Sequence, residues 1–271
     1  MSESALDLMD PKQLRGRSAV VTGSTSGIGL AVAEGLAAAG CNVALSGFGD
    51  AAEIEATRQR LAALGVRVTW SPADLSQGEQ VRGYVEQAIA DFGAVDILVN
   101  NAGIQFVAAV EDFPDDKWEK IVALNLSAAF YATKAALPGM KARDWGRIVN
   151  IASAHGLTAS PFKSAYVSAK HGILGLTKTV ALECAEANIT CNAICPGYVN
   201  TPLVAGQIKD QAKVHNMSEA DVVRNVILAS QPNKRFAETA EIAAMTLFLC
   251  SDAGRSITGV PLSMDGGWTA R

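Results

Sequence analysis

Short apolar runs alternate with longer helical patterns along most of the chain. Seven runs have the length of a buried strand, namely Ser18–Val21, Asn42–Leu45, Val66–Trp70, Val95–Val99, Arg147–Ile151, Ile189–Ile194 and Pro261–Met264. Helices are expected between them at Gly27–Ala39, Ala51–Leu64, Gly78–Phe92, Asp115–Met140, Ser164–Ala187 and Ala240–Cys250. Repeated strand–helix units build parallel sheets through right-handed crossovers. The pattern therefore predicts a single α/β domain with a doubly wound parallel sheet of about seven strands.

Two segments do not follow this alternation. Residues 1–14 are interpreted as an N-terminal tail, and the folded domain is expected to span residues 15–271. Asn200–Phe236 is polar, charged and helical in pattern, with no strand. Because it follows the sixth strand, it should lie above the carboxyl ends of the strands, where such sheets bind ligands. We interpret it as a helical lid over a substrate, with a plain surface excursion as the alternative.

Composition narrows the possible partners and location. With 49% hydrophobic residues in 271, the chain can bury a sizeable core, and its net charge of −4 favours neither nucleic acid nor an anionic membrane as partner. We find no apolar stretch near the roughly 20 residues that span a bilayer, and no secretion or transit signal. The five cysteines are odd in number and lack metal-binding spacing. They are expected to be reduced, so we predict a cytoplasmic protein without a metal.

A glycine-rich loop links the first strand to the first long helix. It reads Thr22-Gly23-Ser24-Thr25-Ser26-Gly27-Ile28-Gly29. Glycines allow a tight turn and close approach of a pyrophosphate, whose charge is stabilised by the N–H groups at the helix start. This placement predicts a dinucleotide-binding Rossmann fold, with Gly23, Thr25, Ser26, Gly27, Ile28 and Gly29 as candidate cofactor contacts.

The turn after the second strand bears on which dinucleotide is bound. It reads Ser46-Gly47-Phe48-Gly49-Asp50, without the acid that often binds the adenosine ribose at the strand end. Neither this turn nor the glycine loop contains the Lys or Arg that the 2′-phosphate of NADP would require, which favours NAD. Phe48 is a candidate contact, and Asp74, with its neighbour Leu75, is placed to bind the adenine amino group. A helix N-cap is the alternative role for Asp74.

Further motifs follow along the chain: Asn100-Asn101-Ala102-Gly103, Asn125, Ser153, Tyr166-Val167-Ser168-Ala169-Lys170 and Pro196-Gly197. Together with the glycine loop, and in this order and spacing over residues 15–271, they resemble the short-chain dehydrogenase/reductase family. Any one motif could arise by chance, whereas the set is specific. The resemblance implies an NAD-dependent dehydrogenase whose cofactor also contacts Asn101, Ala102, Gly103, Tyr166, Lys170, Pro196, Gly197 and Val199.

The chemistry of alcohol oxidation explains these residue types. Loss of hydride from an alcohol carbon also requires removal of the hydroxyl proton by a base. The pKa of tyrosine in water is about 10, too high for this task. Lys170 lies one helical turn from Tyr166, and its charge, together with that of the oxidised nicotinamide, should favour the phenolate and lower that pKa. Ser153 can steady the substrate oxygen, and the resemblance implies that Asn125 holds a water that relays protons from Lys170. Taken singly, these residues could equally be a helix pair and a strand-end cap.

A further set of side chains points to a carboxylate on the substrate: Gln105, His155, Lys163, Gln207 and Trp268. A small hydroxy acid needs one cation and several neutral donors, which Lys163 and its neighbours in this set could supply. The segments Ile151–Leu157 and Lys163–Tyr166, with the C-terminal Gly-Gly-Trp-Thr-Ala-Arg, are similar to those of family members that act on short 3-hydroxy acids. That similarity implies NAD-linked interconversion of (R)-3-hydroxybutyrate and acetoacetate.

One residue departs from that pattern. Tyr198 follows Pro-Gly where the similar proteins often have Trp, and a smaller ring with a hydroxyl should admit a slightly longer acid. Another 3-hydroxy acid, a sugar alcohol or a 3-oxoacyl thioester remain alternative substrates, and a dinucleotide-sensing protein without catalysis is the alternative outside enzymes. The family resemblance also implies a homotetramer built through the Asp115–Met140 and Ser164–Ala187 helices and the C-terminal strand.

Overall fold

A seven-stranded parallel sheet forms the centre of the computed structural model, which describes residues 5–201, 204–205, 208 and 217–270. The strands are β1 Ser18–Val21, β2 Asn42–Ser46, β3 Val68–Ser71, β4 Ile97–Asn100, β5 Gly146–Ile151, β6 Ile189–Pro196 and β7 Pro261–Met264. Their spatial order is β3-β2-β1-β4-β5-β6-β7. The predicted fold and all seven predicted strands are confirmed, with strand ends shifted by two residues at most.

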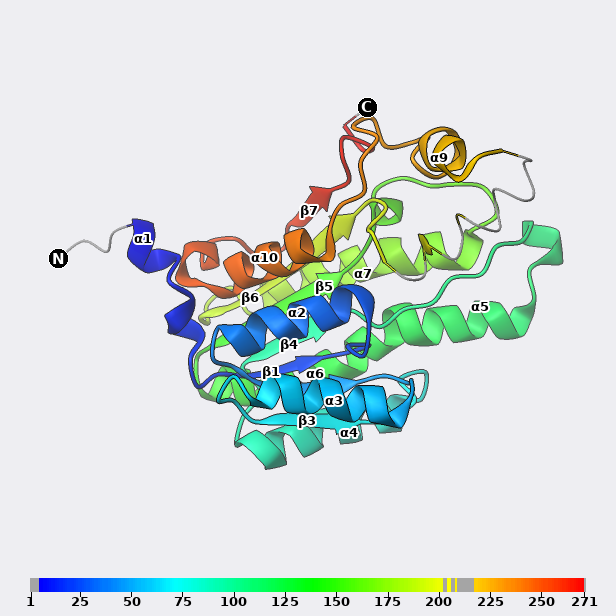
Figure 1. Cartoon of the computed structure of the whole chain (residues 1–271). Helices are drawn as coiled ribbons and strands as arrows, with labels where there is room; N and C mark the ends of the chain where they lie inside the picture. Colours follow the sequence, from blue (N-terminus) through cyan, green and yellow to red (C-terminus); the bar gives the residue numbers. More distant parts are fainter. Residues whose placement is uncertain (1–4, 202–203, 206–207, 209–216, 271) are drawn as a thin grey trace.

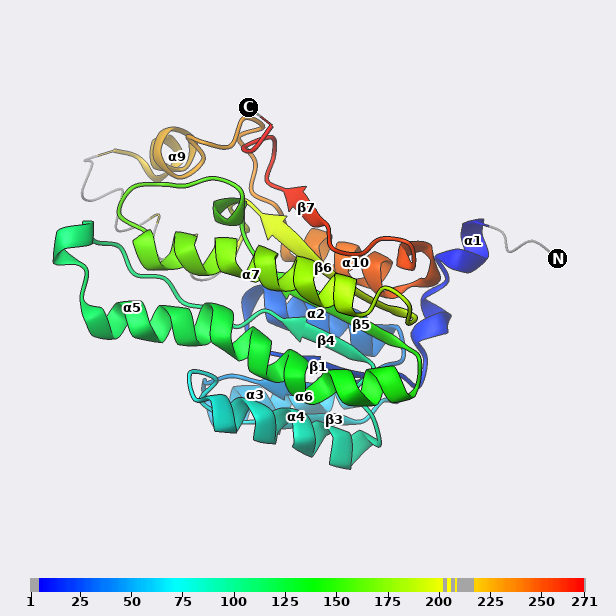
Figure 2. The same ribbon diagram turned by 180° about the vertical axis from the view of Figure 1, so that it is seen from behind.

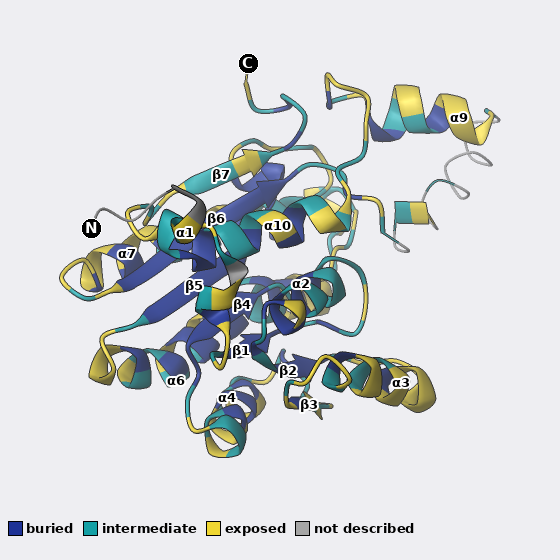
Figure 3. Ribbon diagram, turned by 60° about the vertical axis from the view of Figure 1, so that its left-hand side comes forward, coloured by how far each residue is buried: buried dark blue, intermediate teal, exposed yellow. Residues whose placement is uncertain are grey.

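Helices cover both faces of the sheet (Figures 1 and 2). One face carries α2 Gly27–Ala38, α3 Ala51–Ala62 and α10 Thr239–Cys250, and the other carries α4 Gly78–Phe92, α5 Asp115–Val122, α6 Ala128–Ala142 and α7 Ser164–Glu183. Small side chains allow this close packing: Ala33 of α2 lies in one core cluster, and Ala132 and Ala136 of α6 lie in the other. Figure 3 shows the buried central strands and the partly exposed edge strand β7, with exposed residues on the outer sides of the helices.

The strand order places a ligand site at the carboxyl ends of the central strands. Strand β1 pairs with β2 on one side and with β4 on the other. The connections that leave β1 and β4 therefore run in opposite directions, to α2 on one face and α5 on the other. A crevice opens at such a switch point, beyond the carboxyl ends of the strands.

The helix predicted at Asp115–Met140 is interrupted in its hydrogen bonding. A five-residue π-helical segment, Ala123–Ser127, joins α5 to α6. By length and composition alone, Asp115–Ala142 could cross a membrane, which corrects the expectation that no segment approaches such a length. The fold accounts for its apolar character, because the buried side of α6 packs against β4, β5 and α4.

The two segments outside the strand–helix alternation both contact the domain. Near the N-terminus, α1 spans Ala5–Leu8 and a 3₁₀ turn spans Pro11–Leu14, whose Leu14 is 1% exposed within the core. Between β6 and α10, the described part of the predicted lid includes α9, Glu219–Val222. An isolated bridge between Val199 and Ala237 closes this excursion at its base.

Candidate active site

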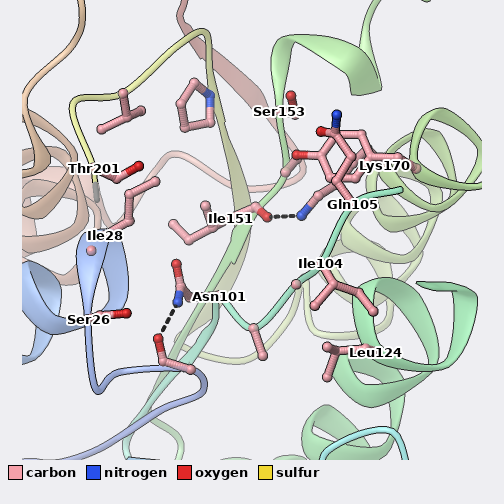
Figure 4. Close-up of a pocket in the computed structure, with 18 of the residues that line it drawn as sticks. Ser26, Ile28, Asn101, Ile104, Gln105, Leu124, Ile151, Ser153, Lys170 and Thr201 are labelled. Carbon is pink, nitrogen blue, oxygen red and sulfur yellow. Dashed lines mark hydrogen bonds between the residues drawn. The ribbon is translucent and has the colours of Figure 1, made fainter. Parts of the chain in front are cut away.

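A cavity of about 640 Å³ lies at the carboxyl ends of β1, β4, β5 and β6. It is lined by nearly every predicted contact: Gly23, Thr25, Ser26, Gly27, Ile28, Phe48, Asp74, Leu75, Asn101, Ala102, Gly103, Gln105, Ser153, His155, Lys163, Tyr166, Lys170, Pro196, Gly197, Tyr198, Val199 and Trp268. Gly29 and Asn125 are not among the lining residues, and Gln207 lies outside the described residues. Figure 4 shows how the side chains from α2, β4, β5 and α7 converge.

The glycine loop is held by the strand beside it. Asn101 donates from its side-chain amide to the carbonyl oxygens of Thr22 and Gly23, at 3.0 and 2.9 Å. The Thr22 hydroxyl oxygen in turn accepts from the backbone N–H groups of Asn101 and Ala102. A Cβ atom on Gly29 would overlap both the Gly23 carbonyl oxygen and the Asn101 amide. Gly29 therefore permits the packing of α2 against the loop instead of facing the cavity.

The start of α2 faces the cavity without an internal cap. Ser26 takes the N-cap position, but its side chain makes no capping hydrogen bond. The first N–H groups of a helix have no partner within the helix, and they carry its positive dipole end. Ser26, Gly27 and Ile28 all line the cavity. An anionic pyrophosphate fits this position, so the residues present suit a dinucleotide.

The turn after β2 is held from two sides. The Thr25 hydroxyl donates to the Phe48 carbonyl oxygen at 3.0 Å, and the Trp70 indole N–H donates to the Gly47 carbonyl oxygen at 3.1 Å. Phe48 remains 69% exposed at the cavity, available to cover a base. Asp50 accepts from the Ala52 and Glu53 N–H groups and caps α3. The acid nearest this turn is therefore engaged by the protein itself.

Asp74 lies at the same end of the cavity. One of its carboxylate oxygens accepts from the Ser76 hydroxyl at 2.7 Å and from the Ser76 N–H at 3.0 Å, and these bonds lower the pKa of Asp74. The alternative role as N-cap of α4 is wrong, because Gln77 occupies that position. Asp74 thus presents an ionised carboxylate at the cavity wall.

Tyr166 and Lys170 leave α7 toward the cavity, beside Ser153 at the end of β5. The Lys170 ammonium donates to the Ile151 carbonyl oxygen at 2.7 Å, and it lies 5.6 Å from the centre of the Tyr166 ring. Burial lowers the pKa of Lys170 to about 8. The buried Lys170 ammonium is thus a stronger acid than that of a free lysine, and it is tied to the same strand end that carries Ser153.

The expected lowering of the Tyr166 pKa is not found in the protein alone. Burial raises the pKa of Tyr166, and a hydrogen bond with the Ser153 hydroxyl opposes that rise. Lys170 lies over the ring and bonds to Ile151, so its charge is not directed at the phenol oxygen. The expectation counted the charges of Lys170 and of the oxidised nicotinamide but omitted the cost of burying a phenolate.

Asn125 lies in the π-helical segment and is 2% exposed. Its side chain donates to the Ile104 carbonyl oxygen and accepts from the Ile104 N–H, both at 2.9 Å. Both ends of the amide are therefore used to hold the loop that follows β4. The relay water that the family resemblance implies at Asn125 stays a prediction.

His155 is buried next to the catalytic candidates. Its Nε2 atom lies 2.9 Å from the Ser160 hydroxyl, and its Nδ1 atom lies 3.5 Å from the Ser153 hydroxyl. Burial, and next the charge of Lys163, lowers the pKa of His155 to about 4. The imidazole is therefore neutral at neutral pH, so Lys163 supplies the positive charge on this side.

Four rings form a continuous wall along the substrate end. His155 meets Tyr166 and Trp268 edge to face, with centroid distances of 5.8 and 5.0 Å. Tyr198 stacks on Trp268, at 5.8 Å and an interplanar angle of 10°. Residues more than 100 positions apart in the chain are thus brought into one surface.

Several lining residues were not predicted: Gly47, Ala73, Ile104, Lys120, Leu124, Ile151, Ala152, Thr201 and Val204. Ile151 and Ala152 directly precede Ser153, so their position was an available signal. Lys120 and Leu124 are four residues apart on one helix face, and nothing in the local pattern distinguishes them from other helix residues. Within the described residues, no group of three metal-ligating side chains gathers in this cavity or elsewhere.

Comparisons with known proteins agree with this geometry. The sequence model of a family described as "Enoyl-(Acyl carrier protein) reductase" matches residues 23–269. A D-beta-hydroxybutyrate dehydrogenase of Rhizobium meliloti (strain 1021) is 53% identical over 256 residues, 94% of this chain and 99% of that protein. A protein of the same name from Cupriavidus necator is 50% identical over 258 residues, 95% of this chain and 100% of that protein.

A solved structure agrees as well. The crystal structure of a putative short-chain alcohol dehydrogenase from Sinorhizobium meliloti 1021 superposes with a TM-score of 0.85 and 35% identity, over 97% of this chain and 99% of that one. Fold, cavity and relatives together define an oxidoreductase that uses a nicotinamide dinucleotide and a small-molecule substrate. The chain belongs to the short-chain dehydrogenase/reductase family.

Proposed function

We propose that the protein catalyses the reversible, NAD-linked oxidation of (R)-3-hydroxybutyrate to acetoacetate. The observation that carries this proposal is the grouping of Lys163, neutral His155 and Gln105 in the same cavity as Ser153 and Tyr166. This set matches a substrate with one carboxylate and one nearby hydroxyl. The relatives of 53% and 50% identity bear the corresponding name.

Three side chains act on the substrate hydroxyl. Tyr166 accepts its proton, and Ser153, already hydrogen-bonded to Tyr166, holds the substrate oxygen. We assign Lys170, whose pKa is lowered to about 8 by burial, the role of passing protons onward. The nicotinamide dinucleotide, when bound, supplies the acceptor for the hydride that leaves the alcohol carbon. Asn125 holds the Ile104 loop, and we assign it the relay water that the family resemblance implies.

A second set of side chains holds the carboxylate. Lys163 supplies the cation, Gln105 and His155 supply neutral donors, and we assign Gln207 to the same set. Burial lowers the pKa of Lys163, and an anion beside it would raise that pKa again. Trp268 and Tyr198 form the wall against the remaining, apolar part of the substrate.

NAD is the proposed cofactor. Its pyrophosphate would lie at the uncapped start of α2, near Ser26, Gly27 and Ile28, and its adenosine would lie between Phe48 and Asp74. The lysines among the described lining residues are Lys120, Lys163 and Lys170, and none lies in the glycine loop or the turn after β2. A 2′-phosphate would therefore find no cation where NADP requires one.

We further infer a cytoplasmic homotetramer. All five cysteines are free and buried, which fits a reducing compartment. Large apolar side chains remain exposed on the helices expected at the interfaces: Trp118 at 40%, Phe130 at 46% and Leu182 at 78%. Burial of such residues against copies of the same chain stabilises an assembly. Sedimentation of the purified protein distinguishes a tetramer from a monomer or dimer.

The direct experiment mixes the purified protein with NAD and (R)-3-hydroxybutyrate and follows NADH absorbance. We expect NADH to form with this enantiomer, with much lower rates for the (S) enantiomer and for NADP. The reverse assay, NADH consumption with acetoacetate, should succeed as well. NADH formation with a neutral alcohol but not with hydroxybutyrate would contradict the proposal and redirect the choice of substrate.

A further inference from the structure

Hydrogen bonds and ring stacking fix the position of Tyr198 at the cavity wall. Its N–H donates to the Gln231 side-chain oxygen at 3.0 Å, and its carbonyl oxygen accepts from the Ala237 N–H at 3.0 Å. One side of its ring stacks on Trp268, and the residue also packs against the apolar cluster of Val222, Ile227 and Leu228. Backbone and ring are therefore fixed, so the phenol oxygen has a defined place at the cavity wall.

That phenol oxygen has no protein partner among the described residues. Burial raises the pKa of Tyr198, which keeps its hydroxyl protonated and able to donate. A charge on Tyr198 would also raise the pKa of Tyr166, which indicates that the two phenols are near one another. Phenylalanine would fill the same stacked position but would lack this donor. The hydroxyl is therefore available to a polar group within the cavity.

The proposed function leaves one part of the substrate for this position. The carboxylate is assigned to Lys163 and its neighbours, and the reacting oxygen is assigned to Ser153 and Tyr166. The remaining arm, which is the methyl group of hydroxybutyrate, must face the other walls, where Tyr198 and Trp268 lie. A methyl group makes no hydrogen bond, whereas a hydroxyl on the same carbon would.

We propose that the Tyr198 hydroxyl binds a polar group on the arm opposite the carboxylate, so that the substrate class includes short 3-hydroxy acids with a second hydroxyl on C4. This inference rests on the proposed function, because it uses the assigned orientation of the carboxylate. It extends that function from acids with an apolar arm to dihydroxy acids. A site built to bind a hydroxyl discriminates more strongly than one that only excludes by size.

Two substrates of equal size test the proposal. (R)-3-hydroxypentanoate ends its arm in a methyl group, and (S)-3,4-dihydroxybutyrate, which has the same spatial arrangement at C3, ends it in a hydroxyl. We measure kcat/KM for both in the parent and in Tyr198→Phe, which removes only the phenol oxygen. The ratio of dihydroxybutyrate to hydroxypentanoate should fall about tenfold, as expected for loss of one hydrogen bond.

Controls separate this effect from general damage. Tyr131→Phe removes a phenol oxygen from α6 outside the cavity and should leave the ratio as in the parent. In Tyr198→Phe the ratio of hydroxybutyrate to hydroxypentanoate should change less than about twofold, because both arms are apolar. Thermal unfolding checks that the variant folds.

Three results would overturn the inference. If the ratio of kcat/KM for dihydroxybutyrate to that for hydroxypentanoate is the same in the parent and in Tyr198→Phe, the Tyr198 hydroxyl does not contact the substrate arm. An equal loss with all three acids would assign Tyr198 a general role instead. If the parent oxidises (R)-3-hydroxybutyrate, either result leaves the proposed function intact. Failure of the parent to oxidise (R)-3-hydroxybutyrate would overturn both proposals together.

Discussion

The two ends of the cavity are built in different ways. At the cofactor end, backbone groups line the site, and the contacts that shape it join three adjacent strands through Asn101, Thr22 and Thr25. At the substrate end, the lining groups are side chains from the ends of β5 and β6, from α7 and from the C-terminal segment. The first end is suited to the constant part of a dinucleotide, while single substitutions can reshape the second.

The first turns of α3 and α2 show the same difference. Asp50 caps α3 with two hydrogen bonds, so the first N–H groups of that helix are satisfied by the protein. Ser26 makes no such bond at α2, which begins at the cavity. Because a cap and an anionic ligand satisfy the same groups, a helix start that binds a ligand is one that the protein leaves uncapped.

The largest effect is expected at the substrate end, from Tyr166→Phe. Removal of the general base should lower kcat for hydroxybutyrate oxidation by about 10³-fold. NADH binding, measured by fluorescence titration, should change little, because the ring remains in place. A variant that folds, binds NADH and retains the parent kcat would refute the assignment of Tyr166 as the base.

Lys163→Ala should separate carboxylate binding from chemistry. Loss of the cation should lower kcat/KM for hydroxybutyrate by about 10²-fold, mainly through a higher KM. Lys117→Ala is the matched control, because Lys117 pairs with Asp116 outside the cavity. Similar steady-state constants for Lys163→Ala and the control would mean that the carboxylate is bound elsewhere.

Gly29→Ala tests the rigid cofactor end. The added methyl group would overlap the Gly23 carbonyl oxygen and the Asn101 amide, which should displace the loop and weaken NADH binding by tenfold or more, on the order of the loss of one or two hydrogen bonds. Gly83→Ala on α4 meets open space and should raise stability by about 0.5–1 kcal/mol. Fluorescence titration and thermal unfolding of both variants give the comparison. Undiminished NADH affinity in Gly29→Ala would argue against a tightly packed loop.

The smallest effects should distinguish the two helix starts. Asp50→Ala should lower the free energy of unfolding by about 1 kcal/mol, because α3 loses its cap, and should leave kcat as in the parent. Ser26→Ala should cost much less stability, and its effect should fall on the KM for NAD. Denaturant titrations and steady-state kinetics measure both. The comparison fails if Ser26→Ala destabilises the protein as much as Asp50→Ala does.

The sequence predicted the elements and motifs whose cause is local. Periodicity alone indicated all seven strands, and the position of the glycine loop indicated where the first long helix begins at the cavity. The spacing of Tyr166 and Lys170 placed both on one side of α7, and both line the cavity. Such features depend on residues within one or two helical turns of each other, so a single segment of the chain is enough to predict them.

Other features of the site needed the folded chain. Three of these features depend on segments that are distant in sequence. They are the hydrogen bonds between Asn125 and Ile104, the position of Lys120 at the cavity, and the stacking of Tyr198 on Trp268. Burial, which also depends on distant segments, raises the pKa of Tyr166, whereas the charges of Lys170 and of the oxidised nicotinamide had predicted a lower one. The amino-acid pattern thus determined which groups take part, and tertiary packing decided their partners and their charge, because hydrogen bonds and desolvation depend on neighbours in space.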